Sequence, residues 1–275
     1  MEFHFINISE FVEDYANYQK LGIEIVGVSY DDVESHKEFA DIYEMEFHLL
    51  ADTEKELSKK LDVDRFLPWP HPSRQTFLVD PNGIIIKHYE DVEPSIHSKE
   101  ILEDFTKLQS QQSSELKKEA LSIVKKFGSI LKPKLVGALK SGGLTHAIEV
   151  CSTQAPQIAK QLSSESGWSV KRVSLKPRNT LAATADIWES KLLTEFDQRQ
   201  SQGEPIASLA KAQLFNDHFR FIKAQPVEAV CLNCHGTQLD PKVVTALNKH
   251  YKDDKATGYT LGQIRGAFSL KKNLN

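Results

Sequence analysis

The sign of the charge changes along this chain, and this divides it into two parts. Residues 1–107 carry 10 Lys+Arg against 24 Asp+Glu, whereas the remainder carries 24 Lys+Arg against 14 Asp+Glu. Each part is long enough to bury a core of its own. We therefore predict two domains, at residues 1–107 and 117–275, with a polar linker at 108–116 that contains Gln-Ser-Gln-Gln-Ser-Ser. Opposite net charges favour docking of the acidic half on the basic half.

Composition excludes several classes of protein. The lysines and arginines of the basic half are scattered and do not alternate with aromatic residues in a stripe, so we expect no nucleic-acid partner. No apolar run is long enough to span a bilayer. The start, Met1 to Phe5, has neither a basic segment nor an apolar one, so it does not resemble a signal peptide.

The pentapeptide Cys231-Leu232-Asn233-Cys234-His235 carries the most specific chemistry. Two thiols three residues apart, followed by an imidazole, form the attachment signature of a c-type haem. It predicts one covalent haem c, with Cys231 and Cys234 in thioether bonds and His235 on the iron. Because such haem is normally attached outside the cytoplasm, we expect a periplasmic or other extracytoplasmic location, although no signal peptide is visible.

Two other readings of the Cys-x-x-Cys pair stay open. It can be a redox dithiol or half of a zinc site. A zinc site needs two more ligands, and Cys151 is the one other thiol in the sequence. A dithiol of the thioredoxin type is expected to open a helix after a strand, and residues 227–230 form at best a weak strand.

Residue patterns in the acidic half alternate between helix and strand. They predict helices at 7–21, 33–43, 53–61 and 94–108, a buried strand at 23–29 and a short strand at 46–50. A hairpin with strands 75–80 and 83–88 turns at Pro81-Asn82. This order fits an α/β sandwich of the thioredoxin-like class.

The basic half also mixes helices and strands. We expect a helix at 114–139 bent at Pro133, a break at Gly142-Gly143 and a second helix from Thr145. Strands follow at 168–175 and 215–222, with helices from Asp186 and over 241–251, and a closing turn and strand within 256–270. Cys151 lies on an apolar stripe of the second helix with Ala147, Ile148, Ala155 and Ile158, where a lone cysteine is either a small buried hydrophobe or an iron ligand.

Four blocks of the acidic half resemble a peroxiredoxin of the bacterioferritin-comigratory type. They are residues 21–29 (LGIEIVGVS), 33–40 (VESHKEFA), 47–52 (FHLLAD) and 73–80 (SRQTFLVD). The resemblance implies that Arg74 is the remnant of the arginine that stabilises a peroxidatic thiolate, although a solvated loop cation is the plainer reading. The family's cysteine aligns near His4, and this sequence has no cysteine before Cys151. Peroxide reduction needs a thiolate, so this half lacks the nucleophile and enzyme activity stays open. We hypothesise that the reading frame starts late or that the gene is decayed.

Blocks of the basic half resemble a family of c-type haem domains with a PAS-like α/β fold, catalogued as a domain of unknown function. They include residues 147–151 (AIEVC), 178–179, 188–189, 231–236 (CLNCHG), 254–259 (DKATGY) and 262–267 (GQIRGA). The resemblance implies that His235 and Cys151 hold the iron from opposite faces.

Further candidates surround this predicted haem site. Arg172, Arg178 and Arg265 are candidates for pairing the propionates, and each is equally well a surface cation. Tyr259 either lines the pocket or is an ordinary core aromatic. The alternatives to Cys151 as sixth ligand are His146, His218 and His250.

These observations favour a haem redox or gas sensor, or an electron-transfer module, fused to a degenerate peroxiredoxin-like domain. Two filled axial positions leave no open place for a substrate. The alternative is an antioxidant thiol peroxidase fused to a haem domain, with its active-site segment missing from this chain; a zinc-stabilised adaptor is a third reading. The partner, an electron donor or a signalling protein, is not identified by the sequence.

Overall fold

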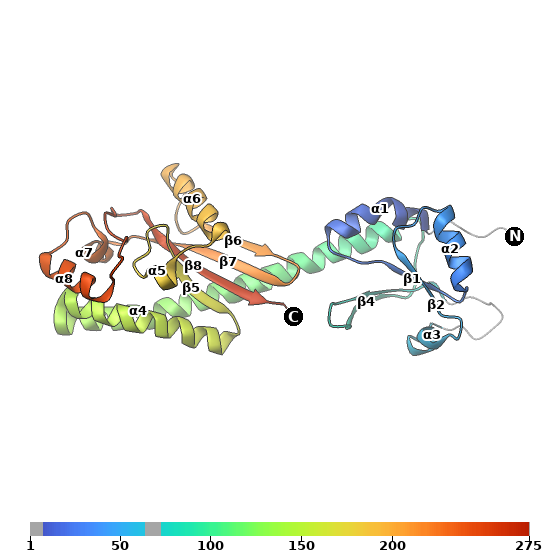
Figure 1. The fold of residues 1–275 in the computed structure, drawn as a ribbon, viewed down its shortest axis with the longest axis horizontal. Coiled ribbons are helices and arrows are strands. Elements are labelled where there is room, and N and C mark those ends of the chain that lie inside the picture. The colour runs from blue at the N-terminus through green and yellow to red at the C-terminus, as the bar shows by residue number, and fades with distance from the viewer. Residues whose placement is uncertain (1–7, 64–72, 275) are drawn as a thin grey trace. The chain divides into compact units, whose positions relative to one another are not determined.

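The structure is a computed structural model that describes residues 8–63 and 73–274. Contacts between residues divide the chain into two compact units, with the division between Ser110 and Gln111. Both units combine helices and strands, which confirms the predicted α/β class (Figure 1).

The first unit holds two separate two-stranded sheets among its described residues. β1 (Val26–Ser29) pairs in parallel with β2 (His48–Ala51), and β3 (Thr76–Val79) pairs antiparallel with β4 (Ile85–Tyr89). The helices are α1 (Ile8–Lys20), α2 (Val33–Ile42), α3 (Glu56–Lys60) and the beginning of α4 (His97–Ser166). The expected helices and strands are therefore present, but the strands are split between two sheets.

The core of the first unit joins α1 to the first turns of α4. Tyr15, Tyr18, Phe47, Tyr89 and Ile101 form its buried cluster. The Tyr18 hydroxyl donates to the backbone carbonyl of Ser98 at 2.8 Å, and burial raises the pKa of Tyr18 to about 12. These contacts hold the first residues of α4 in the first unit.

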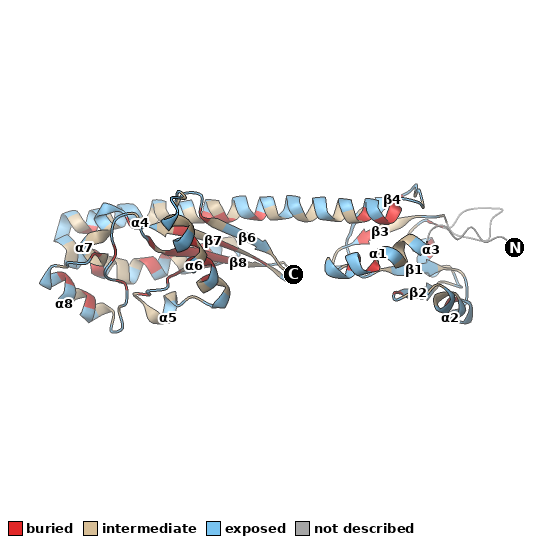
Figure 2. Cartoon of the chain, turned by 90° about the horizontal axis from the view of Figure 1, so that it is seen from above, coloured by how far each residue is buried: buried red, intermediate tan, exposed pale blue. Residues whose placement is uncertain are grey.

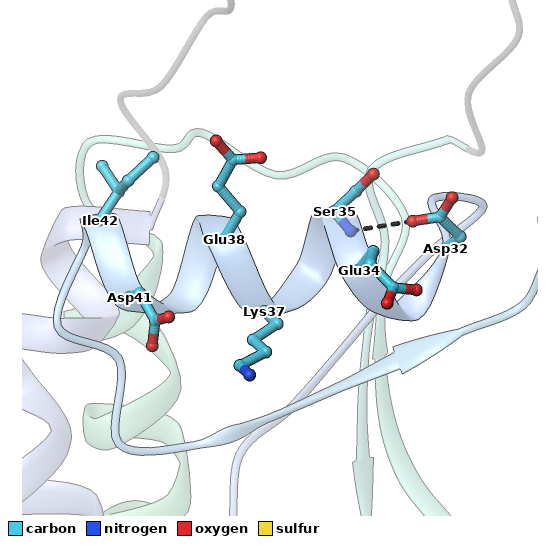
Figure 3. Close-up of a pocket in the computed structure, with 7 residues that line it drawn as sticks. All are labelled: Asp32, Glu34, Ser35, Lys37, Glu38, Asp41 and Ile42. Carbon is cyan, nitrogen blue, oxygen red and sulfur yellow. Dashed lines mark hydrogen bonds between the residues drawn. The ribbon is translucent and has the colours of Figure 1, made fainter.

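Helix α2 presents a charged face to solvent (Figure 3). Asp32 caps the helix by accepting a hydrogen bond from the Ser35 amide at 2.8 Å, and this bond lowers the pKa of its carboxyl. Glu34, Lys37, Glu38 and Asp41 lie along the exposed surface beyond it. This surface has the features of a solvated helix face and holds no thiol.

Helix α4 is two helical arms joined at Gly143, whose φ of 69° and ψ of −160° are not helical. After this residue the chain turns back along itself (Figure 1). The Lys134 ammonium donates to the Gln154 amide oxygen at 2.8 Å, and Lys126 pairs with Glu165 at 2.7 Å. The break expected at Gly142-Gly143 is thus an antiparallel helical hairpin, because glycine adopts a positive φ without steric cost.

The second unit contains a four-stranded antiparallel sheet in the order β5-β8-β7-β6. Its strands are β5 (Ser169–Val173), β6 (Ala210–Leu214), β7 (His218–Pro226) and β8 (Ile264–Asn273). Helices α5 (Thr180–Ala183) and α6 (Ile187–Ser201) follow β5. A 3₁₀ turn (Ala229–Cys231), α7 (Leu232–His235) and α8 (Pro241–His250) lie between β7 and β8.

The two faces of this sheet pack against different helices. Phe221, Phe268 and Leu270 lie on the face that packs on Phe127 and Ile158 of α4. The other face contributes Val173, Ile222 and Ala267 to a cluster with α6. Figure 2 shows buried positions concentrated in the strands and recurring along α4. Neighbouring residues of β5 therefore point into different environments.

The structure differs from the expected secondary structure in several places. The segment 108–116, predicted as a linker, is helical because it lies inside α4, where Leu116 is buried in the core. The division between the two units falls within this segment. The backbone of α4 also stays helical at Pro133, where we expect a bend. Strand β6 was not predicted, and the strand expected at 215–222 runs from His218 to Pro226.

Gly266 lies in β8, where this strand packs closely against β5. A Cβ added there would lie 2.3 Å from the Val173 carbonyl oxygen, and its φ of 153° disfavours other residues. We predict that Gly266→Ala lowers the free energy of unfolding by about 1–3 kcal/mol, because the β5 backbone must move. The control Gly137→Ala, in an exposed helical position with nothing near its Cβ, should raise it by about 0.5–1 kcal/mol. Urea unfolding of the whole chain measures both, and equal stabilities for the two variants would contradict this packing.

Candidate functional site

The Cys-x-x-Cys-His segment folds as a short helical turn. Cys231 ends the 3₁₀ turn, and Cys234 and His235 lie in α7. Residues three apart on a helix lie on the same side, so the two thiols are neighbours. The segment is tied to the loop before β8, because the Tyr259 amide donates to the His235 carbonyl at 2.9 Å and the Gly258 amide to the Gly236 carbonyl at 2.9 Å.

One ring nitrogen of His235 is fixed by the backbone. Nδ1 lies 2.6 Å from the carbonyl oxygen of Ala256, which requires a hydrogen on Nδ1. The acceptor lone pair is then on Nε2. Arg265 Nε lies beside the ring, 3.1 Å from Nδ1 and 3.4 Å from Nε2. Burial, together with the charges of Arg265 and Arg178, lowers the pKa of His235 to about 2. The imidazole is therefore neutral near pH 7, the form that binds a metal.

Arg178 holds the backbone around this histidine. Its Nη2 donates to the carbonyl oxygens of Cys234 and Ala256, the second at 3.2 Å. Its Nε lies 3.0 Å from Asp254 Oδ2, in an ion pair whose side chains are 11% and 9% exposed. This nitrogen has no hydrogen-bond partner, so its contact with Asp254 is an ion pair without a hydrogen bond. One guanidinium thus joins α7 to the loop before β8.

Arg265 is the second cation beside His235. Its Nη1 donates to Ser174 Oγ at 3.2 Å, and its guanidinium carbon lies 5.4 Å from the centre of the Tyr259 ring. Burial lowers the pKa of Arg265 to about 10. Tyr259 is buried and meets the His235 ring edge-on, with ring centres 6.3 Å apart.

Cys151 approaches the same site from the second arm of α4. Burial raises the pKa of its thiol, and the charges of Arg172 and Arg178 oppose that rise. Cys231 also acts on this thiol, and Cys151 acts on Cys234. All the cysteines of the chain therefore lie within one electrostatic neighbourhood, although Cys151 is 80 residues from Cys231 in sequence.

Arg172 supplies a further cation to this neighbourhood. Burial lowers the pKa of its guanidinium, and Cys151 and Tyr251 oppose this. The guanidinium carbon lies 5.6 Å from the ring centre of Phe127 on α4, so the side chain points toward the helical hairpin. β5 places Arg172 there because its side chains alternate between the two faces of the sheet.

Two residues of the site were not predicted. Tyr251 follows α8 and packs with Ile148 and Cys234, and burial and Cys151 raise the pKa of its hydroxyl. Asp254 supplies the carboxylate that pairs with Arg178. The sequence offers no local pattern for either, since both depend on how the loop after α8 folds back.

The other predicted candidates lie elsewhere. Arg74 is exposed in the first unit, and His4 lies outside the described residues. His218 is on β7, where it contacts Asp217 at 2.6 Å and stacks on Phe215. His146 is 44% exposed beside Glu149. His250 Nδ1 lies 3.4 Å from Oγ of Ser152, the residue that follows Cys151.

The described residues contain no group of three or more His, Cys, Asp or Glu side chains placed to hold a metal ion. The site instead combines one imidazole, three thiols and three arginines. None of the helices that the structure describes is long and apolar enough to cross a membrane.

Comparison with known proteins identifies both units. The model of the Tll0287-like family matches residues 89–272, more than half of the chain. The chain belongs to the Tll0287-like family. The model of the AhpC/TSA family matches residues 6–88, so the first unit is peroxiredoxin-like. Both resemblances predicted from the sequence are therefore confirmed.

Individual relatives match one unit each. Chloroplastic peroxiredoxin Q is 37% identical in Oryza sativa subsp. japonica and 36% identical in Arabidopsis thaliana, over 34% of this chain and 43% of each relative. The chain thus spans less than half the length of these relatives. The crystal structure of the cyanobacterial haem protein Tll0287 is 23% identical, with a TM-score of 0.43 over 56% of this chain and 95% of that one. The Xanthomonas campestris bacterioferritin comigratory protein is 26% identical, with a TM-score of 0.34 over 36% of this chain and 66% of that one.

Arg178 offers a test of how the site is held together. We predict that Arg178→Gln lowers the free energy of unfolding by about 3–5 kcal/mol, because Asp254 is left buried without a counter-charge. The amide of Tyr259 should also exchange its hydrogen faster, since it donates to the segment that Arg178 holds. Urea unfolding and hydrogen exchange measure the two effects.

Arg199→Gln is the matched control. Arg199 is 35% exposed and pairs with Glu195 and Glu204 at the surface, so its loss should cost no more than about 1 kcal/mol. A similar loss of stability in both variants would show that Arg178 has no special role in the site.

Proposed function

We propose that the second unit binds one haem c covalently through Cys231 and Cys234, with His235 and Cys151 as the axial ligands of the iron. The observation that carries this proposal is the convergence of a Cys-x-x-Cys-His turn, a distant thiol and half-buried arginines. When bound, the group supplies one-electron redox chemistry at a metal with two protein ligands.

The charges of the site fit this group. Arg172, Arg178 and Arg265 bring three positive charges to a largely buried place, and Asp254 is the carboxylate paired there. A haem has two propionates, which offset the remaining charge, and guanidinium binds carboxylate in a bidentate manner. A ferric porphyrin core has a single positive charge, which a Cys151 thiolate neutralises. A neutral sixth ligand would leave a buried charge uncompensated, so the balance favours Cys151 over His250.

The orientation of His235 also supports the proposal. Ala256 accepts the hydrogen of Nδ1, which leaves Nε2 as the atom for the iron and fixes the ring. Arg265 lies beside both ring nitrogens and would have to withdraw from Nε2, which would make its guanidinium available to a propionate.

We further propose a role in electron transfer, or in sensing redox state or a diatomic gas. With His235 and Cys151 both holding the iron, no ligand position would remain for a substrate, which would argue against a substrate-binding haem enzyme. An anionic thiolate stabilises ferric iron, so a low potential is expected within the range of about 0.8 V that axial ligands set. An extracytoplasmic location follows from the covalent attachment.

A thiol peroxidase is the second candidate, favoured by the AhpC/TSA match at residues 6–88. This sequence has no cysteine before Cys151, so these residues alone do not supply the nucleophile. Peroxide consumption by the whole chain tests it, and turnover that survives Cys151→Ala and removal of haem would favour this candidate.

Covalent attachment is tested by mass. The whole chain, expressed with a cytochrome c maturation system, should gain the mass of one haem and keep its Soret band after extraction with acidified acetone. Cys231→Ala/Cys234→Ala should yield protein of the mass of the chain alone. His235→Ala isolates the role of the imidazole, since it removes the iron ligand and keeps both thiols. A colourless wild-type product from cells that mature other cytochromes c would contradict the proposal.

The sixth ligand is tested by spectroscopy. We predict that ferric wild-type protein shows the low-spin signature of thiolate and imidazole, and that Cys151→Ser abolishes it and raises the reduction potential. His250→Ala and His146→Ala should leave both readouts unchanged, because neither side chain has the negative charge that the site requires. A bis-imidazole low-spin spectrum that His250→Ala abolishes and Cys151→Ser leaves unchanged would assign the ligand to His250.

A further inference from the structure

The second unit has a polar cavity on the face of the sheet that packs against α6. It measures about 260 Å³, and its wall is formed by β5, β7 and β8 together with the first turn of α6. Lys171, Arg220 and Lys271 line it from the strands. β5 separates it from the haem site, because Lys171 binds the first turn of α6 whereas Arg172 points toward Phe127 of α4.

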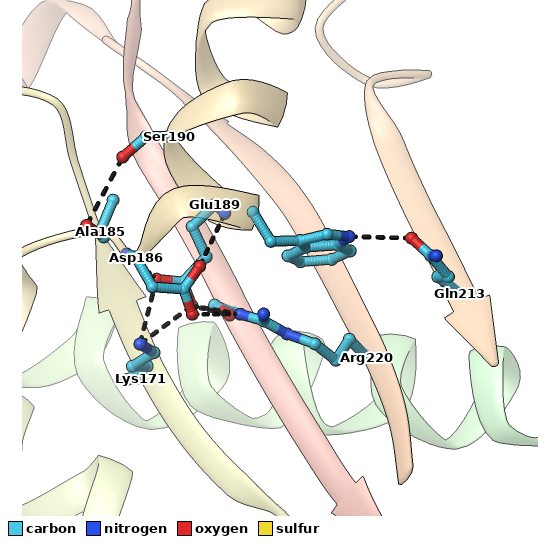
Figure 4. A network of polar contacts seen from close by, with 9 residues as sticks. Lys171, Ala185, Asp186, Glu189, Ser190, Gln213 and Arg220 are labelled. Carbon is cyan, nitrogen blue, oxygen red and sulfur yellow. Dashed lines mark hydrogen bonds and ion pairs between the residues drawn. The ribbon is translucent and has the colours of Figure 1, made fainter. Parts of the chain in front are cut away.

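A buried carboxylate forms the base of this cavity. Glu189 is completely buried, and Lys171 and Arg220 lie 2.9 Å and 3.1 Å from its Oε1. The Ser269 hydroxyl donates to the same oxygen at 2.6 Å, and the Asp186 amide donates to Oε2 at 2.8 Å. Figure 4 shows this network around the start of α6. Glu189 has its acceptors filled from within the protein, so it serves as a scaffold for the two cations.

Asp186 is likewise occupied. It caps α6 by accepting from the Glu189 amide at 2.8 Å, and its other oxygen accepts from Arg220 Nη2 at 2.6 Å. The Trp188 ring covers Arg220, with the guanidinium carbon 4.1 Å from the ring centre. Both carboxylates of the cavity therefore already have their partners.

Positive charge exceeds negative charge in the wall of the cavity. Lys171, Arg220 and Lys271 outnumber Asp186 and Glu189, while His218 turns to Asp217. Nε of Arg220 is buried and has no hydrogen-bond partner among the described residues. Lys271 lines the cavity from an exposed position, where its charge also attracts the Asp217 carboxylate. The buried Nε of Arg220 is costly to leave without a partner, which indicates that an acceptor from outside the chain completes the site.

We propose that this cavity binds a small organic carboxylate, such as a dicarboxylate. The ligand accepts hydrogen bonds from Lys271 and Arg220, and Ser169 and Ser269 line its polar surroundings. The volume suits a metabolite of a few carbons, because pockets for drug-sized ligands measure about 300–1,000 Å³. The site lies apart from the cysteines and does not depend on haem.

Isothermal titration of the whole chain with succinate tests the proposal, at constant ionic strength set by sodium chloride. We expect saturable binding that weakens at least tenfold in Lys271→Gln. Lys271 is exposed, and circular dichroism verifies that this variant keeps its fold. Lys117→Gln is the matched control, since it removes the same charge from an exposed position of α4, and it should bind like the wild type.

Three outcomes would overturn the assignment. No saturable succinate binding would exclude a carboxylate site. Binding of inorganic phosphate in place of succinate would assign the cavity to a tetrahedral anion. Equal weakening in Lys117→Gln and Lys271→Gln would show attraction by overall charge and not by the cavity. The measurement is independent of haem loading, so failure here leaves the haem proposal intact.

Discussion

The arrangement of the Cys-x-x-Cys-His turn depends on one buried guanidinium. Arg178 donates to the carbonyls of Cys234 and Ala256 and pairs with Asp254, so it binds two loops that are about twenty residues apart in sequence. Ala256 in turn fixes the ring of His235. Without this arginine, the short helix α7 has few bonds of its own, because a four-residue helix satisfies little of its backbone internally.

The sequence predicts local features well and long-range ones poorly. The helices of both units and the hairpin of β3 and β4 follow from apolar periodicity and turn residues. The pentapeptide 231–235 is recognisable because its chemistry is contiguous. Cys151 and the three arginines became candidates by resemblance and by charge. The structure brings the arginines near His235, and two of them, Arg172 and Arg178, near Cys151. Tyr251 and Asp254 stay hidden in the sequence, because their roles arise from the path of a loop.

The errors have a common physical cause. Residues 109–116 look like a linker because they are polar, but helix formation needs only one buried stripe, and Leu116 together with Ala120 supplies it. Strand β6 is short and mixes Lys211 and Gln213 with small apolar residues, and it is recognisable as a strand through its pairing with β7. Tertiary contacts decide both segments, and no window of sequence contains those contacts.

The pairing of β5 with β8 sets Lys171 opposite Ser269 and Arg172 opposite Phe268. Because side chains alternate along a strand, a slip by a single residue would exchange the two cations between the faces of the sheet. Arg172 would then meet Glu189, and Lys171 would replace it beside Cys151. The register of β5 on β8 thus determines both the site around Cys151 and the cavity around Glu189. An insertion or deletion within β5 would disrupt both of them.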